Sequence, residues 1–144
     1  IMCGIAGHFF KQVSDESCSS SLLQNHLTVL SHRGPDDFGY YQDHGSGIGL
    51  VHRRLSIVDT SLYGHQPMLS DCGKVVLIFN GEIYNFKSLK SELIQQGYTF
   101  RSQSDTEVLL NCYLQCRDQG FEGLYSISSM LRRLNGIFSF AIIT

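Results

Sequence analysis

The chain has 144 residues, of which 42% are hydrophobic and 17% are charged, and its formal net charge is −2. This size fits one soluble domain with a buried core, and the scattered basic residues exclude the clustered positive surface of a nucleic-acid binder. No apolar run approaches the roughly 20 residues of a membrane-spanning helix, and the N-terminus lacks the features of a secretory signal. We therefore expect a cytoplasmic protein without nucleic-acid or membrane partners.

The first half of the chain is expected to hold mainly short apolar strands. In chain order the pattern predicts a strand over 3–10, a helix over 16–30, an irregular stretch over 31–39, strands over 47–52 and 55–59, a loop over 60–70 and a strand over 74–79.

The second half is expected to hold two helices and a strand. Asn85 is the expected N-cap of a helix that ends before Gly97. Ser104 and Glu107 have capping-box spacing, which predicts that each side chain binds a first-turn amide of the next helix. A less periodic stretch and a final strand follow, over 118–130 and 137–143. Because strands outnumber crossover helices, we expect a mainly antiparallel α+β layer fold.

Five cysteines are present, an odd number, and there is no export signal, so we expect reduced thiols. Cys112 and Cys116 are four residues apart on an expected helix. No clustered histidines or Cys-x-x-Cys pattern accompanies them, so no metal site is predicted. We expect both to be small residues of the core.

Both ends of the sequence are unusual. Ile1 precedes Met2, so we expect the natural start to be Met2. The last residues, 139–144, fall inside an expected buried strand, which indicates a C-terminally incomplete domain with an exposed apolar edge and poor solubility.

Cys3 would become the first residue if Met2 were removed. A terminal cysteine combines a nucleophilic thiol with a free α-amine of pKa ~7.7–8.0, which can act as its general base. Without further support, a small buried residue is the more frequent role for such a cysteine.

Asn80 and Gly81 follow directly on the expected strand over 74–79. The asparagine side-chain amide and the glycine backbone amide could aim two donors at one point and form an oxyanion hole. The alternative is an Asn-Gly hairpin turn, which spacing alone favours.

Three charged residues are candidates for binding an amino acid. Arg53 and Arg54 lie between strand-like runs, so their side chains must face opposite sides. We expect one to face solvent, while the other could hold a carboxylate bidentately; two solvated arginines are the alternative. Asp105, at the mouth of a helix, could bind an ammonium group or could only favour the helix dipole.

Six motifs in order, MCGIAG, SHRGPDDFG, HRRLSIVD, GHQPM, FNGEIYNF and SDTEVLL, resemble the glutaminase domain of the asparagine synthetase family. The resemblance implies a class II glutamine amidotransferase domain over residues 2–144, with a poor match over 115–130. It also implies the N-terminal-nucleophile hydrolase fold, a four-layer αββα sandwich of two mainly antiparallel sheets. The ATP-using synthetase domain of the family is absent from these residues.

The resemblance also implies site roles. Cys3 is the expected nucleophile, with Asn80 and Gly81 as the oxyanion hole. The substrate-binding residues that it implies are Arg54 for the α-carboxylate, Glu82 and Asp105 for the α-ammonium, and the backbone of Leu55, Ser56, Ile57 and Val58 as lining. It assigns no catalytic step to 32–37, and His52 and His65 are expected to be structural or surface residues.

The implied activity is hydrolysis of glutamine to glutamate and ammonia through a cysteine thioester. The ammonia would serve ATP-dependent synthesis of asparagine or a related amide, an amino-acid biosynthetic ligase reaction. We expect no cofactor or metal in this domain, and we expect ATP and Mg²⁺ to bind in the missing synthetase domain. The expected partners are glutamine and that synthetase domain. A homodimer is one arrangement open to the family. With Ile1 and Met2 capping Cys3, we expect the chain as given to be inactive.

Three alternatives remain open at this point. One is a non-catalytic interaction or regulatory module of the same fold. Another is an ammonia donor to an acceptor other than aspartate. The last is a different cysteine hydrolase that uses one of the six histidines as its base, which is disfavoured because Cys3 needs no histidine.

Overall fold

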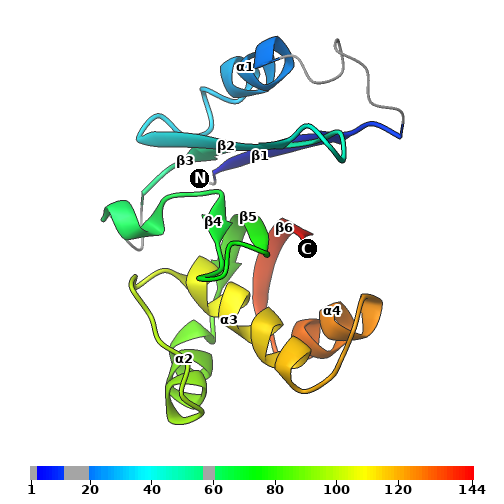
Figure 1. Cartoon of the computed structure of the whole chain (residues 1–144). Helices are drawn as coiled ribbons and strands as arrows, with labels where there is room; N and C mark the ends of the chain where they lie inside the picture. Colours follow the sequence, from blue (N-terminus) through cyan, green and yellow to red (C-terminus); the bar gives the residue numbers. More distant parts are fainter. Residues whose placement is uncertain (1–2, 12–19, 57–60) are drawn as a thin grey trace.

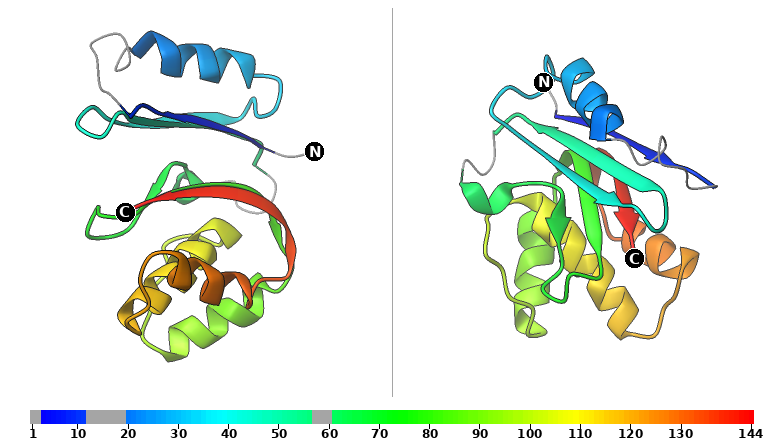
Figure 2. Two further views of the ribbon diagram at one scale, coloured as in Figure 1. Left: turned by 90° about the vertical axis from the view of Figure 1, so that its right-hand side faces the viewer. Right: turned by 45° about the horizontal axis from the view of Figure 1, so that its top comes forward.

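A computed structural model of the chain describes residues 3–11, 20–56 and 61–144 (Figure 1). Two three-stranded antiparallel sheets face each other, and helices cover the outer face of each. Helix α1 (Ser20–Val29) lies over one sheet, and three helices lie over the other, which gives four layers (Figure 2). The predicted α+β αββα sandwich is confirmed.

The first sheet has the order β1-β3-β2, with β1 (Gly4–Phe9), β2 (Asp37–Asp43) and β3 (Ile48–Arg54). Two predictions here were wrong. Strand β2 begins within the stretch expected to be irregular. The sequence pattern did not predict it, because an edge strand with exposed aromatic residues does not show the alternation of a half-buried strand. The strand expected over 55–59 is not observed at Leu55 and Ser56, because the preceding strand β3 continues to Arg54 and ends there. Residues 57–59 lie outside the described residues.

The second sheet has the order β4-β5-β6, with β4 (Met68–Leu69), β5 (Val76–Ile83) and β6 (Gly136–Ile143). Asn80 and Gly81 lie inside β5, paired with β6 in continuous register, so the hairpin-turn alternative is wrong. Gly81 has φ +154°, and a Cβ built there would lie 2.4 Å from the Cα of the opposite residue on β6. This close approach of two backbones requires glycine.

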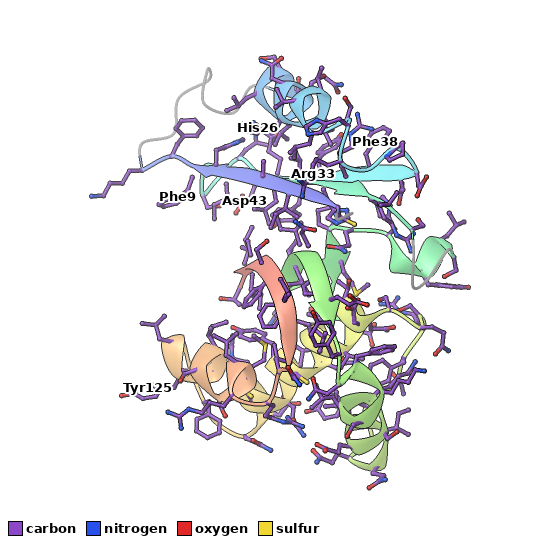
Figure 3. All side chains as sticks on the ribbon, turned by 180° about the vertical axis from the view of Figure 1, so that it is seen from behind. Phe9, His26, Arg33, Phe38, Asp43 and Tyr125 are labelled. Carbon is purple, nitrogen blue, oxygen red and sulfur yellow. The ribbon has the colours of Figure 1, made fainter. Side chains whose placement is uncertain are left out.

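The helices of the outer layer are α2 (Phe86–Gln95), α3 (Asp105–Asp118) and α4 (Leu124–Leu131), and a short 3₁₀ helix, η1 (Leu62–Gly64), precedes β4. Asn85 occupies the predicted N-cap position of α2, but its side chain binds the backbone of Arg133 and Asn135 instead. Helix α4 lies in the stretch expected to be less periodic, and Tyr125 points from it away from the sheets (Figure 3).

The capping box of α3 is only half formed. Ser104 Oγ accepts a hydrogen bond from Glu107 N, as predicted. The Glu107 carboxylate instead accepts from the backbone amides of Arg101 and Ser102 and from the Ser102 hydroxyl, because the chain turns back over the helix there. The carboxylate therefore fixes the preceding loop.

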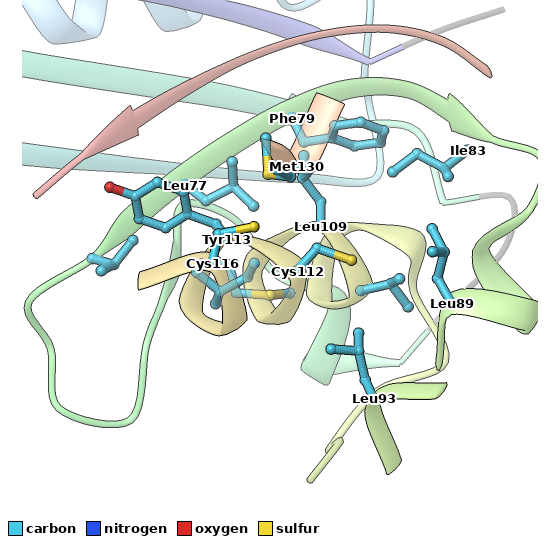
Figure 4. Close-up of a cluster of buried hydrophobic side chains, with 14 residues drawn as sticks. Leu77, Phe79, Ile83, Leu89, Leu93, Leu109, Cys112, Tyr113, Cys116 and Met130 are labelled. Atoms are coloured by element: carbon cyan, nitrogen blue, oxygen red, sulfur yellow. The ribbon is translucent and has the colours of Figure 1, made fainter. Parts of the chain in front are cut away.

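Three apolar clusters fill the spaces between the layers. The largest lies between β5 and helices α2 to α4 and contains Cys112 and Cys116 as free thiols, as predicted (Figure 4). A smaller cluster packs α1 on the first sheet. The third, with the buried residues Leu50, Val76 and Ile78, lies between the two sheets. Within the described ranges, no helix is long and apolar enough to cross a membrane.

Candidate active site

Cys3 lies immediately before β1, at the edge of the first sheet, and is half-buried. Its Sγ accepts a hydrogen bond from Leu55 N at 3.3 Å and can donate to Leu55 O at 3.6 Å. The Cys3 carbonyl accepts from both Nε and Nη2 of Arg33 at 3.4 Å. The expected nucleophile is therefore held by the residue that follows β3 and by the loop after α1.

The stretch 32–37, for which the motif gave no role, supports this end of the first sheet. Besides the Arg33 contact, Asp36 N donates to Arg54 O at 3.1 Å, and Asp36 Oδ2 accepts from Ser56 N at 2.8 Å. A Cβ at Gly34 would lie 2.5 Å from the Arg54 backbone nitrogen, so only glycine fits. Sequence reasoning missed this support, although charged residues around a Gly-Pro pair were a visible sign of it.

Side-chain alternation directs the predicted site residues into the space between the sheets. Arg54 shares a face of β3 with Leu50, and Asn80 shares a face of β5 with Val76 and Ile78. Those three aliphatic residues form the core between the sheets, so Arg54 and Asn80 point from opposite sheets toward the same space. The end of this space lies beside Cys3, because β1 pairs with β3 there.

Arg54 is only 7% exposed, and its Nη1 donates to Ser61 O at 2.9 Å. Its guanidinium lies over Gly64, where a Cβ would be 2.1 Å from Nη2. Arg53 lies on the opposite face, as predicted, but it does not simply face solvent. It donates to Leu27 O at 3.0 Å and stacks over the Phe38 ring at 5.0 Å, because α1 covers that face.

Asn80 and Gly81 offer two groups for binding an anion. The buried Oδ1 of Asn80 has no hydrogen-bond partner among the described residues, and a flip of the amide would place its NH₂ there. Along β5, the N–H groups of Phe79 and Ile83 bind side chains at the edge that faces β4. Because N–H groups of alternate residues share one edge, Gly81 N–H points to this edge between them.

Asp105 lies at the N-terminus of α3, and its Oδ2 accepts from Ile83 N at 3.0 Å. Burial raises the pKa of Asp105, and the negative charge of the nearby Glu82 raises it further, against the backbone hydrogen bonds. Asp105 and Glu82 therefore place negative charge at this end of β5, which suits an ammonium group.

The predicted lining segment is only partly described. The backbone of Leu55 binds the Cys3 sulfur, and Ser56 N binds Asp36. Ile57 and Val58 lie outside the described residues. Among the described residues, no group of three or more His, Cys, Asp or Glu side chains could hold a metal ion.

Sequence reasoning also missed the contact that His52 makes between the two sheets. His52 is fully buried, and its Nε2 lies 3.0 Å from Phe79 O, so this nitrogen carries the proton. Burial, with a smaller effect of the Arg54 charge, lowers the pKa of His52 to about 4. The imidazole is therefore neutral and serves as a hydrogen-bond donor.

This burial predicts an acid-sensitive fold. The unfolded state binds the histidine proton below its ordinary pKa of 6.5, whereas the native state binds it only near pH 4. The contribution of His52 to stability is therefore complete above pH 6.5 and is lost as the pH falls to 4, by about 3 kcal/mol. Urea unfolding at several pH values should show a weaker acid dependence for His52→Gln than for the exposed control His32→Gln. Equal dependence in both variants would contradict the assignment.

Two facing antiparallel sheets between helical layers, with a cysteine directly before the first strand, define an N-terminal-nucleophile hydrolase fold. The model of a family described as "Glutamine amidotransferase domain" matches residues 2–144. Asparagine synthetase [glutamine-hydrolyzing] 1 of Bacillus subtilis (strain 168) is 38% identical over 142 residues, which cover 98% of this chain and 20% of that protein. Amidase chry2 of Gibberella zeae is 30% identical over 98% of this chain and 21% of its own length.

The solved structure of glutamine phosphoribosylpyrophosphate amidotransferase from B. subtilis matches with a TM-score of 0.70 and 25% identity, over 99% of this chain and 35% of that one. The chain belongs to the glutamine amidotransferase domain family, as its motifs predicted. It spans about a fifth of the curated relatives that it matches.

Proposed function

We propose that this domain hydrolyses glutamine to glutamate and ammonia, with Cys3 as an N-terminal nucleophile. The main support is the convergence of Arg54 and Asn80 from opposite sheets on the end of the sandwich where Cys3 lies. One guanidinium, one pair of carboxyl groups and one anion site match the three polar groups of glutamine: its α-carboxylate, its α-ammonium and its side-chain carbonyl.

Arg54 binds the α-carboxylate, and Asp105 with Glu82 binds the α-ammonium. A guanidinium has five N–H donors, so it can bind a backbone carbonyl and also hold a carboxylate. Burial, with a smaller effect of the Glu82 charge, raises the pKa of Asp105, and a bound ammonium group would stabilise its charged form. Binding the charged end of glutamine at these residues leaves its amide to reach toward Cys3.

The reaction then needs only the two groups of the terminal residue and the anion site. The free α-amine of Cys3 takes the thiol proton, and the sulfur attacks the amide carbon. The new oxyanion is held by the Asn80 side chain and the Gly81 amide. The C–N bond breaks as the α-ammonium returns the proton to nitrogen, and ammonia leaves.

Water completes the cycle. The amine takes a proton from water, the hydroxide adds to the thioester carbon, and the thiolate leaves and recovers the proton. Glutamate is released. His52 is an unsuitable base because burial lowers its pKa to about 4, so the imidazole holds an added proton poorly near neutral pH, which counts against a mechanism that depends on this histidine.

We further propose that the ammonia serves synthesis of asparagine or a related amide by a separate ATP- and Mg²⁺-dependent domain, with no cofactor in the domain described here. The names of the matched Bacillus relatives support aspartate as acceptor, and the similar match to an amidase of Gibberella supports other acceptors. The free thiols of the described cysteines support a reducing compartment such as the cytoplasm.

The proposal is tested by freeing or capping the terminal amine. The chain is produced as two proteins, one beginning at Cys3 and one beginning at Ile1, where Ile1 and Met2 convert the Cys3 amine into an amide. We expect only the first to release glutamate from glutamine, measured by an enzyme-coupled glutamate assay. Equal release by both, or no release by the folded Cys3-first protein, would contradict the proposal.

A further inference from the structure

Strand β4 is much shorter than the strand it pairs with. It has two residues, which pair with Val76 and Leu77, whereas β5 continues to Ile83. Among the described residues, no strand pairs with this edge of β5 beyond Leu77. Buried backbone groups need partners, so side chains must take the place of the missing strand.

Two side chains bind both backbone groups of Phe79. Gln66 Oε1 accepts from Phe79 N at 2.7 Å, and His52 Nε2 donates to Phe79 O at 3.0 Å. Both are buried, Gln66 at 5% and His52 at 0% exposure. They come from different places: His52 from the facing sheet and Gln66 from the segment before β4.

The orientation of Gln66 is itself fixed. Its Nε2 donates to Thr106 Oγ1 at 3.2 Å, and Thr106 is buried in the first turn of α3, next to Asp105. The carboxamide therefore presents its oxygen, not its nitrogen, to Phe79. This contact links the anion-binding strand to the helix end that carries the expected ammonium-binding carboxylate.

The position of Phe79 controls the two groups that follow it. The Phe79 carbonyl belongs to the peptide that joins Phe79 to Asn80, so the His52 bond fixes the plane from which the Asn80 side chain projects. The next peptide carries the Gly81 N–H, and two residues further on Ile83 N is held by Asp105. The anion site is thus fixed on both sides by buried side chains.

We propose that Gln66 and His52 are positioning residues that hold the Phe79 peptide groups and thereby aim the Asn80 amide and the Gly81 N–H at the oxyanion. The inference rests on the proposed glutamine hydrolysis. Neither residue touches substrate. Arg54 and Asp105 bind the other end of glutamine, so loss of either positioning contact lowers kcat more than it raises KM.

The kinetic test uses the protein with Cys3 at its terminus. Gln66→Met and His52→Leu keep the bulk and remove the hydrogen bonds, and each is expected to lower kcat for glutamine about tenfold to a hundredfold, the effect of a misplaced reacting group. KM should stay within about twofold, since ground-state binding is unchanged. His52→Gln, whose amide can donate from near the Nε2 position, should recover most of kcat, whereas the shorter His52→Asn should not.

A matched control is Gln115→Met. Gln115 is another buried glutamine, bonded to Gln96 and Arg133 at the far part of α3. We expect this change to lower stability but to leave kcat unchanged. If kcat of folded His52→Leu and Gln66→Met equals that of the control, or if KM rises while kcat is kept, the proposal is wrong. Should those variants not fold, Thr106→Val and the His52→Gln and His52→Asn pair give the same comparison.

A second readout does not depend on the activity. In ¹⁵N-labelled Gln66→Met, the Phe79 backbone amide should exchange faster with solvent because it loses its acceptor, and the Gly81 backbone and Asn80 side-chain amide signals should shift. The Ile83 amide, held by Asp105, should keep its protection. If the unmutated protein releases no glutamate, the proposed function fails and these amide signals alone decide the positioning role. Unchanged Gly81 and Asn80 signals would overturn it.

Discussion

Replacing Cys3 with alanine in the protein that begins at this residue will abolish glutamate release from glutamine. The variant keeps the terminal amine, Arg54 and the anion site, so glutamine still binds but no thioester can form. We expect a loss on the order of 10⁴ or more in kcat, as for removal of a nucleophile elsewhere. The assay is release of glutamate under saturating glutamine, with binding followed separately by calorimetry.

The matched control for this change is Cys72→Ala. Cys72 is exposed, and hydrogen bonds from Ser70 and from the Lys74 backbone lower its pKa, which makes its thiol the natural competitor for any sulfur-dependent reaction. We expect Cys72→Ala to keep full activity. Equal glutamate release by Cys3→Ala and the unmutated protein would refute the nucleophile assignment.

Asn80→Ala should lower kcat by roughly 10²–10³, the effect of removing one oxyanion donor, without loss of stability. Stability should be kept because the buried Oδ1 of Asn80 has no hydrogen-bond partner among the described residues. It therefore adds a desolvation cost, and no hydrogen bond, to the folded state. Urea unfolding should therefore show an unchanged or slightly higher free energy of unfolding. This combination of lost turnover and kept stability distinguishes a catalytic from a structural asparagine.

Asn111→Ala provides the opposite case. Asn111 is a buried asparagine of α3 whose Nδ2 donates to Thr99 O at 3.1 Å. Its removal should cost about 1 kcal/mol of stability and leave kcat unchanged. If Asn80→Ala loses stability as Asn111→Ala does, and keeps its kcat, Asn80 is an ordinary structural residue.

The regular parts of the fold were predictable because their cause is local. Apolar periodicity located most strands and the helices that contain Cys112 and Leu93, and a motif resemblance supplied the sandwich. Strand β2 was not predicted, because an edge strand with exposed Phe38 and Tyr40 does not alternate between apolar and polar residues. The Asn-Gly pair suggested a turn on local grounds, and only the pairing with β6 keeps it in a strand.

For the proposed site, the sequence led only to groups expected to touch substrate. The chemistry of Cys3, Arg54 and Asp105 can be inferred from residue types and motif position. The roles of His52 and Gln66 cannot, because both depend on the length of β4 and on contacts between segments far apart in the chain. A short neighbouring strand creates the need for those side chains, and sequence periodicity does not report it.

The proposed nucleophile and its anion-stabilising groups are carried by different sheets. Cys3 belongs to the β1 side of the sandwich and Asn80 to the β5 side, with Leu50, Val76 and Ile78 stacked between them. The volume of these three aliphatic side chains sets the spacing of the two sheets. It therefore also sets the distance between the Cys3 sulfur and the groups that hold the oxyanion. A change of one methylene in these residues would therefore act on the distance between the sulfur and the anion-binding groups, although none of the three is polar or touches substrate.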